Sequence, residues 1–162
     1  MALLKVRKSK INIPKEAQLM CDKMLKDLER SKRPVLTAVK CSLDNSLYNS
    51  RVGYLTPGDK RVKTELNVSS VQKLARTVFM LEVLLNNIDT GAVNTKRELY
   101  YMAKGLVKSE KELKPLDFEE QTESDAVIDY ICDVLEVYRE ELNCFANDRG
   151  GQTYSKELIV TE

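Results

Sequence analysis

Two adjacent tyrosines, Tyr100 and Tyr101, lie near the end of the run TKRELYYM and are the side chains of this sequence best suited to covalent chemistry. Arg97 lies four residues before Tyr101, and Lys104 lies three residues after it. On a helix these spacings place a guanidinium, a phenol and an ammonium on one face. Because a phenol has an ordinary pKa of about 10, it needs nearby positive charge to act as a nucleophile. The same positive charge attracts a phosphodiester, so the pattern predicts a tyrosine that attacks DNA.

The basic residues of this run are the expected contacts to the DNA backbone: Lys96, Arg97 and Lys104. A structural interpretation of the same residues stays open at this point. Paired tyrosines on an amphipathic helix often pack against a core with their hydroxyls at the surface, and flanking basic residues often form the solvated side. The spacing alone does not decide between packing and chemistry.

Composition limits the class of protein. The chain has 162 residues, 43% of them hydrophobic and 31% charged, enough for one domain with a core or for a small domain with an extension. No stretch approaches the roughly 20 apolar residues of a membrane span, and the apolar part of the first ten residues is too short for a signal peptide. We therefore expect a cytoplasmic protein that is associated with the nucleoid and not with a membrane.

Several kinds of catalytic site are excluded by residue type. The sequence has no histidine, which removes Ser-His and Cys-His machinery, and its four cysteines form no C-x-x-C pair for zinc. Three acids around the start of a predicted helix offer an alternative metal site: Glu120, Glu123 and Asp125. Acids at a helix N-terminus also stabilise the helix dipole, and we predict that role and no metal site in this chain.

Charge is unevenly distributed although the net charge is only +1. Residues 1–63 contain 15 lysines and arginines against 6 aspartates and glutamates, whereas residues 109–145 contain 3 against 12. The acidic part is unsuited to lie along phosphates. We expect any DNA contact to come from the basic part and from the helix that carries Arg97 and Lys104.

The pattern of the first 66 residues predicts a helix and a small antiparallel sheet. A helix is expected from Pro14 to about Arg33, followed by strands at residues 34–42, 51–55 and 61–66. The next elements are a long helix that Ser69 caps and Gly91 ends, and a tyrosine helix that opens with the capping box Thr95-x-x-Glu98.

A polar loop is predicted from Lys104 to Asp117, followed by a helix capped by Ser124 and a short turn at residues 138–142. Strands are expected in NCFANDRGG and in SKELIVTE, joined by a tight turn. Three helices followed by a β-hairpin have the element order of a winged helix. We therefore predict an α+β protein with two parts, residues 1–66 (arm, helix and small sheet) and residues 67–162 (a winged-helix domain of the catabolite-activator type).

A second segment, DFEEQTESDAVIDYICDVLEVYREELNCFANDRGG at residues 117–151, narrows the function. Read with TKRELYYM, it resembles the A subunit of archaeal DNA topoisomerase VI and, more distantly, the meiotic transesterase that makes double-strand breaks. The shared pieces, in order, are an Arg-acid-aliphatic-Tyr-Tyr helix, an E-Q-x-E-S-D helix start, R-E-E-L and an A-x-R-G turn. The resemblance covers roughly residues 15–151, and its motifs are specific in combination.

The resemblance implies that Tyr101 is the nucleophile that forms a 5′-phosphotyrosyl bond to DNA and that Arg97 accompanies it. It implies the A subunit of a type IIB topoisomerase, acting on double-stranded DNA as a homodimer, with an ATP-binding B subunit as partner. The family holds Mg²⁺ on acids of a following domain, and we expect this chain to stop before that domain. On that expectation the isolated chain binds no cofactor and is inactive alone.

Two other functions fit the sequence. One is a non-enzymatic winged-helix DNA-binding protein or a truncated remnant, in which the tyrosine is dispensable. The other is a protein-interaction piece, in which the basic arm and the helix from Pro14 dock on the B subunit.

Overall fold

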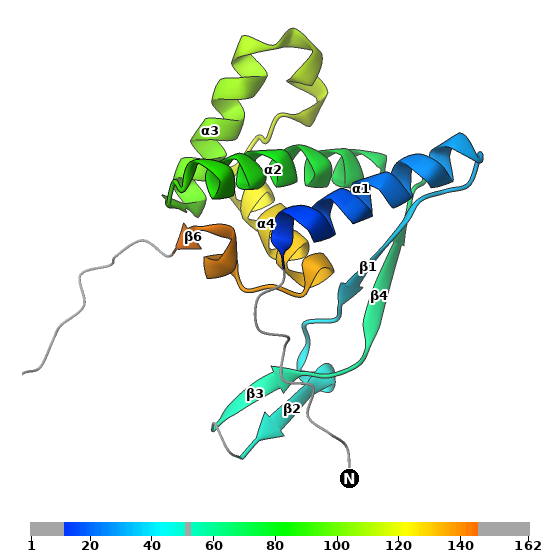
Figure 1. The fold of residues 1–162 in the computed structure, drawn as a ribbon, viewed down its shortest axis with the longest axis vertical. Coiled ribbons are helices and arrows are strands. Elements are labelled where there is room, and N and C mark those ends of the chain that lie inside the picture. The colour runs from blue at the N-terminus through cyan, green and yellow to red at the C-terminus, as the bar shows by residue number, and fades with distance from the viewer. Residues whose placement is uncertain (1–11, 51–52, 146–162) are drawn as a thin grey trace, which may run out of the picture.

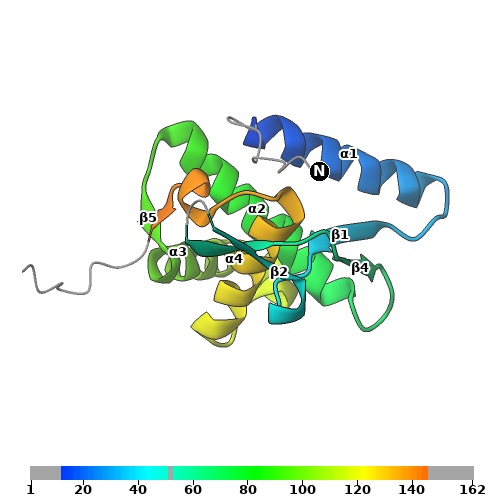
Figure 2. The same cartoon turned by 90° about the horizontal axis from the view of Figure 1, so that it is seen from below.

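Four α-helices form the body of the structure, a computed structural model that describes residues 12–50 and 53–145 (Figure 1). They are α1 (Ile13–Glu29), α2 (Val71–Thr90), α3 (Lys96–Ser109) and α4 (Gln121–Leu135). Helix α2 contacts the other three helices, and Figure 2 shows α1 lying along its outer side. The mixture of helices and short strands confirms the predicted α+β class.

Apolar side chains from all four helices meet in one core. The helical periodicity of α2, α3 and α4 places these side chains on the inner faces. The largest fully buried ones include Phe118, Met80, Leu84, Leu99 and Ile128. Ile13 and Ala17 in the first turns of α1 belong to the same core, whereas Leu25 and Leu28 near its end are exposed. The part of α1 from Ile13 to Cys21 therefore packs against the core.

Two antiparallel strand pairs lie between α1 and α2 in the chain. Strand β1 (Val35–Val39) pairs with β4 (Arg61–Glu65), and β2 (Ser46–Asn49) pairs with β3 (Tyr54–Pro57). The single small sheet of the prediction is therefore wrong in detail, because the chain forms two separate two-stranded sheets. The β2–β3 hairpin projects from the helical body, at the opposite end from the tip of α3 (Figure 1).

A buried asparagine explains why the strand pairs separate. The Asn45 amide nitrogen donates to the carbonyl oxygens of Lys40 at 2.8 Å and Lys60 at 3.2 Å, and the Lys60 amide donates back to Asn45 Oδ1 at 3.0 Å. These bonds use backbone groups of Lys40 and Lys60, and the pairing of β1 with β4 therefore ends at this crossing of the two chain segments. A Cβ on Gly58 would lie 2.6 Å from Asn45 Oδ1, so this crossing requires glycine.

The structure corrects the predicted start of α2 and confirms its predicted end. The N-cap is Ser70 and not Ser69, because the Asn67 side chain accepts hydrogen bonds from both serine amides at 2.9 Å and delays the first turn. At the other end Gly91 has φ of 68° and closes the helix in the left-handed conformation, as the sequence predicts.

The region after the tyrosines is more ordered than predicted. The polar loop expected from Lys104 is wrong, since α3 continues to Ser109 and the 3-10 helix η2 (Lys111–Leu116) follows. The helix continues because the apolar side chains of Ala103 and Val107 extend its buried face. Ser124 is also not a cap, because α4 begins at Gln121 and the buried Ser124 hydroxyl donates to the Gln121 carbonyl at 2.8 Å.

A short parallel pair ties the start of α3 to the end of the described chain. Strand β5 (Asn94–Thr95) pairs with β6 (Cys144–Phe145), which follows the predicted turn, seen as the 3-10 helix η3 (Arg139–Leu142). The rest of the predicted hairpin, at residues 146–162, and the basic arm, at residues 1–11, lie outside the described residues. The winged-helix assignment and the division after residue 66 stay predictions.

In the ranges 12–50 and 53–145, no helix is both long and apolar enough to cross a bilayer.

Candidate nucleic-acid interface around Tyr101

The tyrosine helix begins at a reciprocal cap. The Glu98 amide donates to Thr95 Oγ1 at 3.2 Å, and the Thr95 amide donates to Glu98 Oε2 at 2.6 Å. The bond from the Thr95 backbone, with that from its side chain, lowers the pKa of Glu98 below its ordinary value. The predicted capping box is therefore confirmed, and it fixes the position at which the first turn of α3 starts.

Tyr101 is presented to solvent. Its side chain lies on the outer face of α3, and the residue is 56% exposed. The guanidinium carbon of Arg97 lies 5.8 Å from the centroid of the Tyr101 ring, within the range of a cation–π contact. The sequence spacing thus correctly placed these two side chains together, and a phosphate that approaches the phenol meets the Arg97 guanidinium beside it.

Tyr100 has a different environment although it is the adjacent residue. Its side chain is half-buried, its hydroxyl donates to the Glu119 carbonyl at 3.3 Å, and its ring centroid lies 5.3 Å from that of Tyr101. The Lys104 ammonium lies 5.2 Å from the Tyr100 ring centroid. A hydrogen bond to the Tyr100 hydroxyl raises the pKa of Lys104. Lys104, predicted to share the face of Tyr101, is therefore engaged with Tyr100.

Lys96 points toward α4. Its ammonium forms an ion pair with Asp129 at 2.7 Å, and its side chain is only 19% exposed. This contact spans α3 and α4, and nothing in the local sequence pattern of either helix indicates it. The role of Lys96 in DNA binding stays a prediction, and the structure shows that Asp129 already partners its charge.

Glu120 and Glu123, at the start of α4, are engaged with neighbouring groups of the protein. Glu123 accepts a hydrogen bond from the Glu119 amide at 2.8 Å, which with the Arg76 guanidinium at 3.4 Å lowers its pKa. Glu120 accepts from the Thr122 hydroxyl at 3.2 Å. Among the residues that the structure describes, no three histidine, cysteine, aspartate or glutamate side chains gather in a manner suited to a metal.

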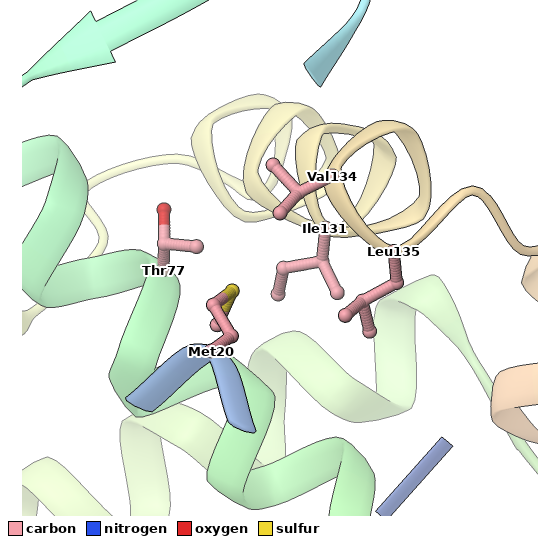
Figure 3. Close-up of a pocket in the computed structure, with 5 residues that line it drawn as sticks. All are labelled: Met20, Thr77, Ile131, Val134 and Leu135. Carbon is pink, nitrogen blue, oxygen red and sulfur yellow. The ribbon is translucent and has the colours of Figure 1, made fainter. Parts of the chain in front are cut away.

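Two hollows of the described surface lie away from α3. Figure 3 shows Met20 of α1 close to Ile131 and Leu135 of α4, in a small apolar gap that Thr77 of α2 also lines. A groove of about 320 Å³ runs between α1, β1 and α4 and includes Leu19, Met24 and Leu36. Neither hollow is lined by the tyrosines or by Arg97, so neither provides a pocket for their chemistry.

The geometry around Tyr101 suits a polymeric substrate. An exposed phenol beside a guanidinium, outside both of these hollows of the described residues, can meet a phosphodiester of a long strand without enclosing it. Arg97 can neutralise charge that develops on the non-bridging oxygens during attack by the phenol. A small-molecule substrate would need more enclosure than this surface offers.

Comparisons with known proteins identify the family that the chain resembles. Residues 72–144 match the family model of type IIB DNA topoisomerase. The chain is 29% identical to the A subunit of type 2 DNA topoisomerase 6 from Methanocaldococcus jannaschii over 143 residues, which is 88% of this chain and 37% of that protein. It is 28% identical to the corresponding protein from Pyrococcus abyssi over 138 residues, which is 85% of this chain and 35% of that one.

The chain thus spans about a third of the length of the curated relatives that it matches. No solved structure matches it significantly. The family match includes α3 and α4 with both tyrosines, and the matches to relatives extend over most of the chain. The resemblance to the A subunits of type IIB topoisomerases, inferred from the sequence motifs, is confirmed.

Proposed function

We propose that this relative of type IIB topoisomerase A subunits provides the DNA-cleaving tyrosine of such an enzyme. Tyr101 Oη attacks the phosphorus of a DNA phosphodiester, the bond from phosphorus to the 3′ oxygen breaks, and the phenol proton is lost as the 3′ oxygen gains one. The 5′ end of the strand stays bound to Tyr101. Reversal of the same steps reseals the strand, because the phosphotyrosyl bond conserves the energy of the original ester.

The observation that carries the proposal is the exposed Tyr101 with Arg97 on the same face of a capped helix. The cap and the buried residues of α3 fix the direction of both side chains, and preorganised charge is the main protein contribution in phosphoryl transfer. Arg97, together with Lys96 when it exchanges Asp129 for a phosphate, would hold the DNA backbone, and Lys104 would add positive charge to the same helix from its place over the Tyr100 ring.

The remaining parts of the activity follow from the family and belong to the same proposal. Two copies of the A subunit would each cut one strand of double-stranded DNA, and a B subunit would bind ATP and drive strand passage. Mg²⁺, held by acids of a separate metal-binding domain, would supply further charge neutralisation at the phosphate. The enzyme would act in the cytoplasm, where the DNA lies.

A covalent-adduct assay tests the role of Tyr101. The full chain, supplied with the metal-binding domain of a family member, a B subunit, Mg²⁺ and ATP, should form a protein–DNA adduct that denaturation with detergent traps. Tyr101→Phe should abolish the adduct and leave DNA affinity unchanged within about twofold. Arg97→Gln should slow adduct formation by about 100-fold or more, the usual loss when one transition-state donor is removed.

Two controls make the result specific. Tyr48→Phe, an exposed tyrosine of β2, should leave the adduct unchanged. An adduct that survives Tyr101→Phe would overturn the assignment. Salt-dependent DNA binding with no adduct from any variant would instead favour the second function predicted from the sequence, a non-enzymatic DNA-binding protein.

A further inference from the structure

The two tyrosines of the pair have separate attachments. Tyr101 is turned to solvent beside Arg97, whereas Tyr100 packs against the core and donates its hydroxyl to the Glu119 carbonyl. Adjacent residues of an α-helix point about 100° apart, so a contact that fixes the direction of one also fixes the other. Whatever holds Tyr100 in place therefore adds to the cap and the buried residues of α3 in setting the direction in which Tyr101 leaves the helix.

The carbonyl that Tyr100 contacts belongs to a firmly held connection between η2 and α4. Phe118, the residue before Glu119, is fully buried, and the Arg76 guanidinium of α2 lies 5.1 Å from its ring centroid. Arg76 also donates to the Asp117 carbonyl and forms an ion pair with Glu123. The Glu123 carboxylate in turn accepts a hydrogen bond from the Glu119 amide. The connection is thus attached to α2 on one side and to α4 on the other.

Lys104 completes the attachment from the side of α3. Its ammonium lies over the Tyr100 ring, one turn further along the helix. The acids Asp117 and Glu119 act electrostatically on the same ammonium. The ring of Tyr100 is therefore held between a lysine of its own helix and the connection that α2 and α4 support.

We propose that Tyr100, with Lys104, is a positioning residue that sets the rotation of α3 and thereby presents Tyr101 to the scissile phosphate. This inference rests on the proposed function of Tyr101 and gives the other member of the pair a distinct role. Tyr100 does not touch the substrate. It acts through the hydrogen bond to Glu119, which removal of a single oxygen atom abolishes while the ring remains.

The attachment itself can be tested on the full chain without DNA. Tyr100→Phe should accelerate amide hydrogen exchange in α3 about fivefold, as loss of one neutral hydrogen bond allows, and leave α2 unchanged. Tyr48→Phe, the same change on the exposed β2–β3 hairpin, should have no effect on α3. Lys104→Met, which keeps most of the side-chain length, should accelerate exchange at the same amides. Unchanged exchange in both α3 variants would overturn the inference.

The consequence for cleavage is tested in the adduct assay. Tyr100→Phe should lower the maximal rate of adduct formation about tenfold at saturating DNA, because misplacement of a nucleophile lowers rate. The dissociation constant for DNA should stay within about twofold, which separates positioning from binding. The melting temperature of the variant should stay within a few degrees of the original, which separates positioning from unfolding.

The outcomes distinguish this inference from the proposed function. If Tyr101→Phe abolishes the adduct and Tyr100→Phe forms it at the original rate, the positioning role is wrong and the function of Tyr101 stands. If Tyr101→Phe retains the adduct and Tyr100→Phe loses it, Tyr100 is itself the nucleophile and both proposals are wrong. A tenfold slower adduct with unchanged DNA affinity and faster α3 exchange supports the inference.

Discussion

Lys96 of α3 and Asp129 of α4 form an ion pair with 2.7 Å between the ammonium nitrogen and the carboxylate oxygen. The pair begins at the first residue of the tyrosine helix, directly after strand β5, whose pairing with β6 ties down the same end of the helix. The Lys96 side chain is mostly buried, whereas that of Asp129 is 62% exposed. The acid therefore both attaches α3 to α4 and neutralises a cation that the sequence assigns to DNA binding.

Asp129→Asn should strengthen DNA binding, because it makes the Lys96 ammonium available to a phosphate. We expect affinity to rise a few-fold and the slope of log affinity against log salt to steepen by up to about one unit, as for one additional phosphate contact. Fluorescence anisotropy at several salt concentrations measures both. Asp89→Asn removes the same charge from the exposed end of α2 and is the control. Equal gains in both variants would show a general charge effect and contradict the release of Lys96.

The capping box gives α3 a defined dependence on pH. The pKa of Glu98 is lowered in the folded state, so the stability from its ionised form is present above the ordinary glutamate pKa of about 4.3 and is lost as the pH falls through the lower folded value. Glu98→Gln should therefore be less stable than the original chain at pH 7, and the difference should vanish at low pH. Urea unfolding between pH 7 and pH 3 measures it.

Two controls accompany the capping test. Glu82→Gln, at an exposed position of α2, should show no such convergence. Thr95→Ala, which removes the other half of the box, should cost about 1 kcal/mol at all pH values above the transition. A constant difference between the Glu98 variant and the original chain from pH 7 to pH 3 would mean that the carboxylate does not contribute through its charge.

The cysteines should differ in their rates of alkylation, and the difference should show which thiols the core buries. Burial raises the pKa of Cys132 to about 12 and that of Cys144 to about 11, so neither forms appreciable thiolate at pH 8. Cys41 is exposed on the surface. Iodoacetamide at pH 8 should therefore modify Cys41 first, and Cys132 and Cys144 only when the chain unfolds, as peptide mass spectrometry can follow. Cys41→Ser supplies the control, and fast modification of Cys144 in the folded chain would contradict the packing.

Features set by local rules were predictable from the sequence. The Thr95–Glu98 box, the Gly91 helix end and the contact between Arg97 and Tyr101 each depend on residues within four positions, and the structure has all three. The strands predicted at residues 34–42 and 61–66 were also correct in place, as β1 and β4, whereas their pairing with each other was not predicted. Of these features, the capping box and the Arg97–Tyr101 spacing concern the site, where the exposed Tyr101 lies beside Arg97.

Features set by contacts between distant residues were not predictable in the same way. The polar residues after Lys104 indicated a loop, but burial of Val107 extends α3 to Ser109. The attachment of Tyr100 to Glu119 and of Lys96 to Asp129 joins residues 19 and 33 positions apart. The periodicity of apolar residues along one helix gives no information on contacts between residues of different helices or loops. A hint existed in Tyr100 itself, because adjacent helical residues face different surroundings and two tyrosines in sequence therefore cannot share one environment.

The parallel pairing of β5 with β6 joins Thr95, the cap of the tyrosine helix, to Phe145, the last residue that the structure describes. A pull or a twist applied to the chain beyond Phe145 would reach that cap through a ladder only two residues long. The start of the helix that carries Tyr101 is thus connected, through β5 and β6, to the part of the chain that follows Phe145.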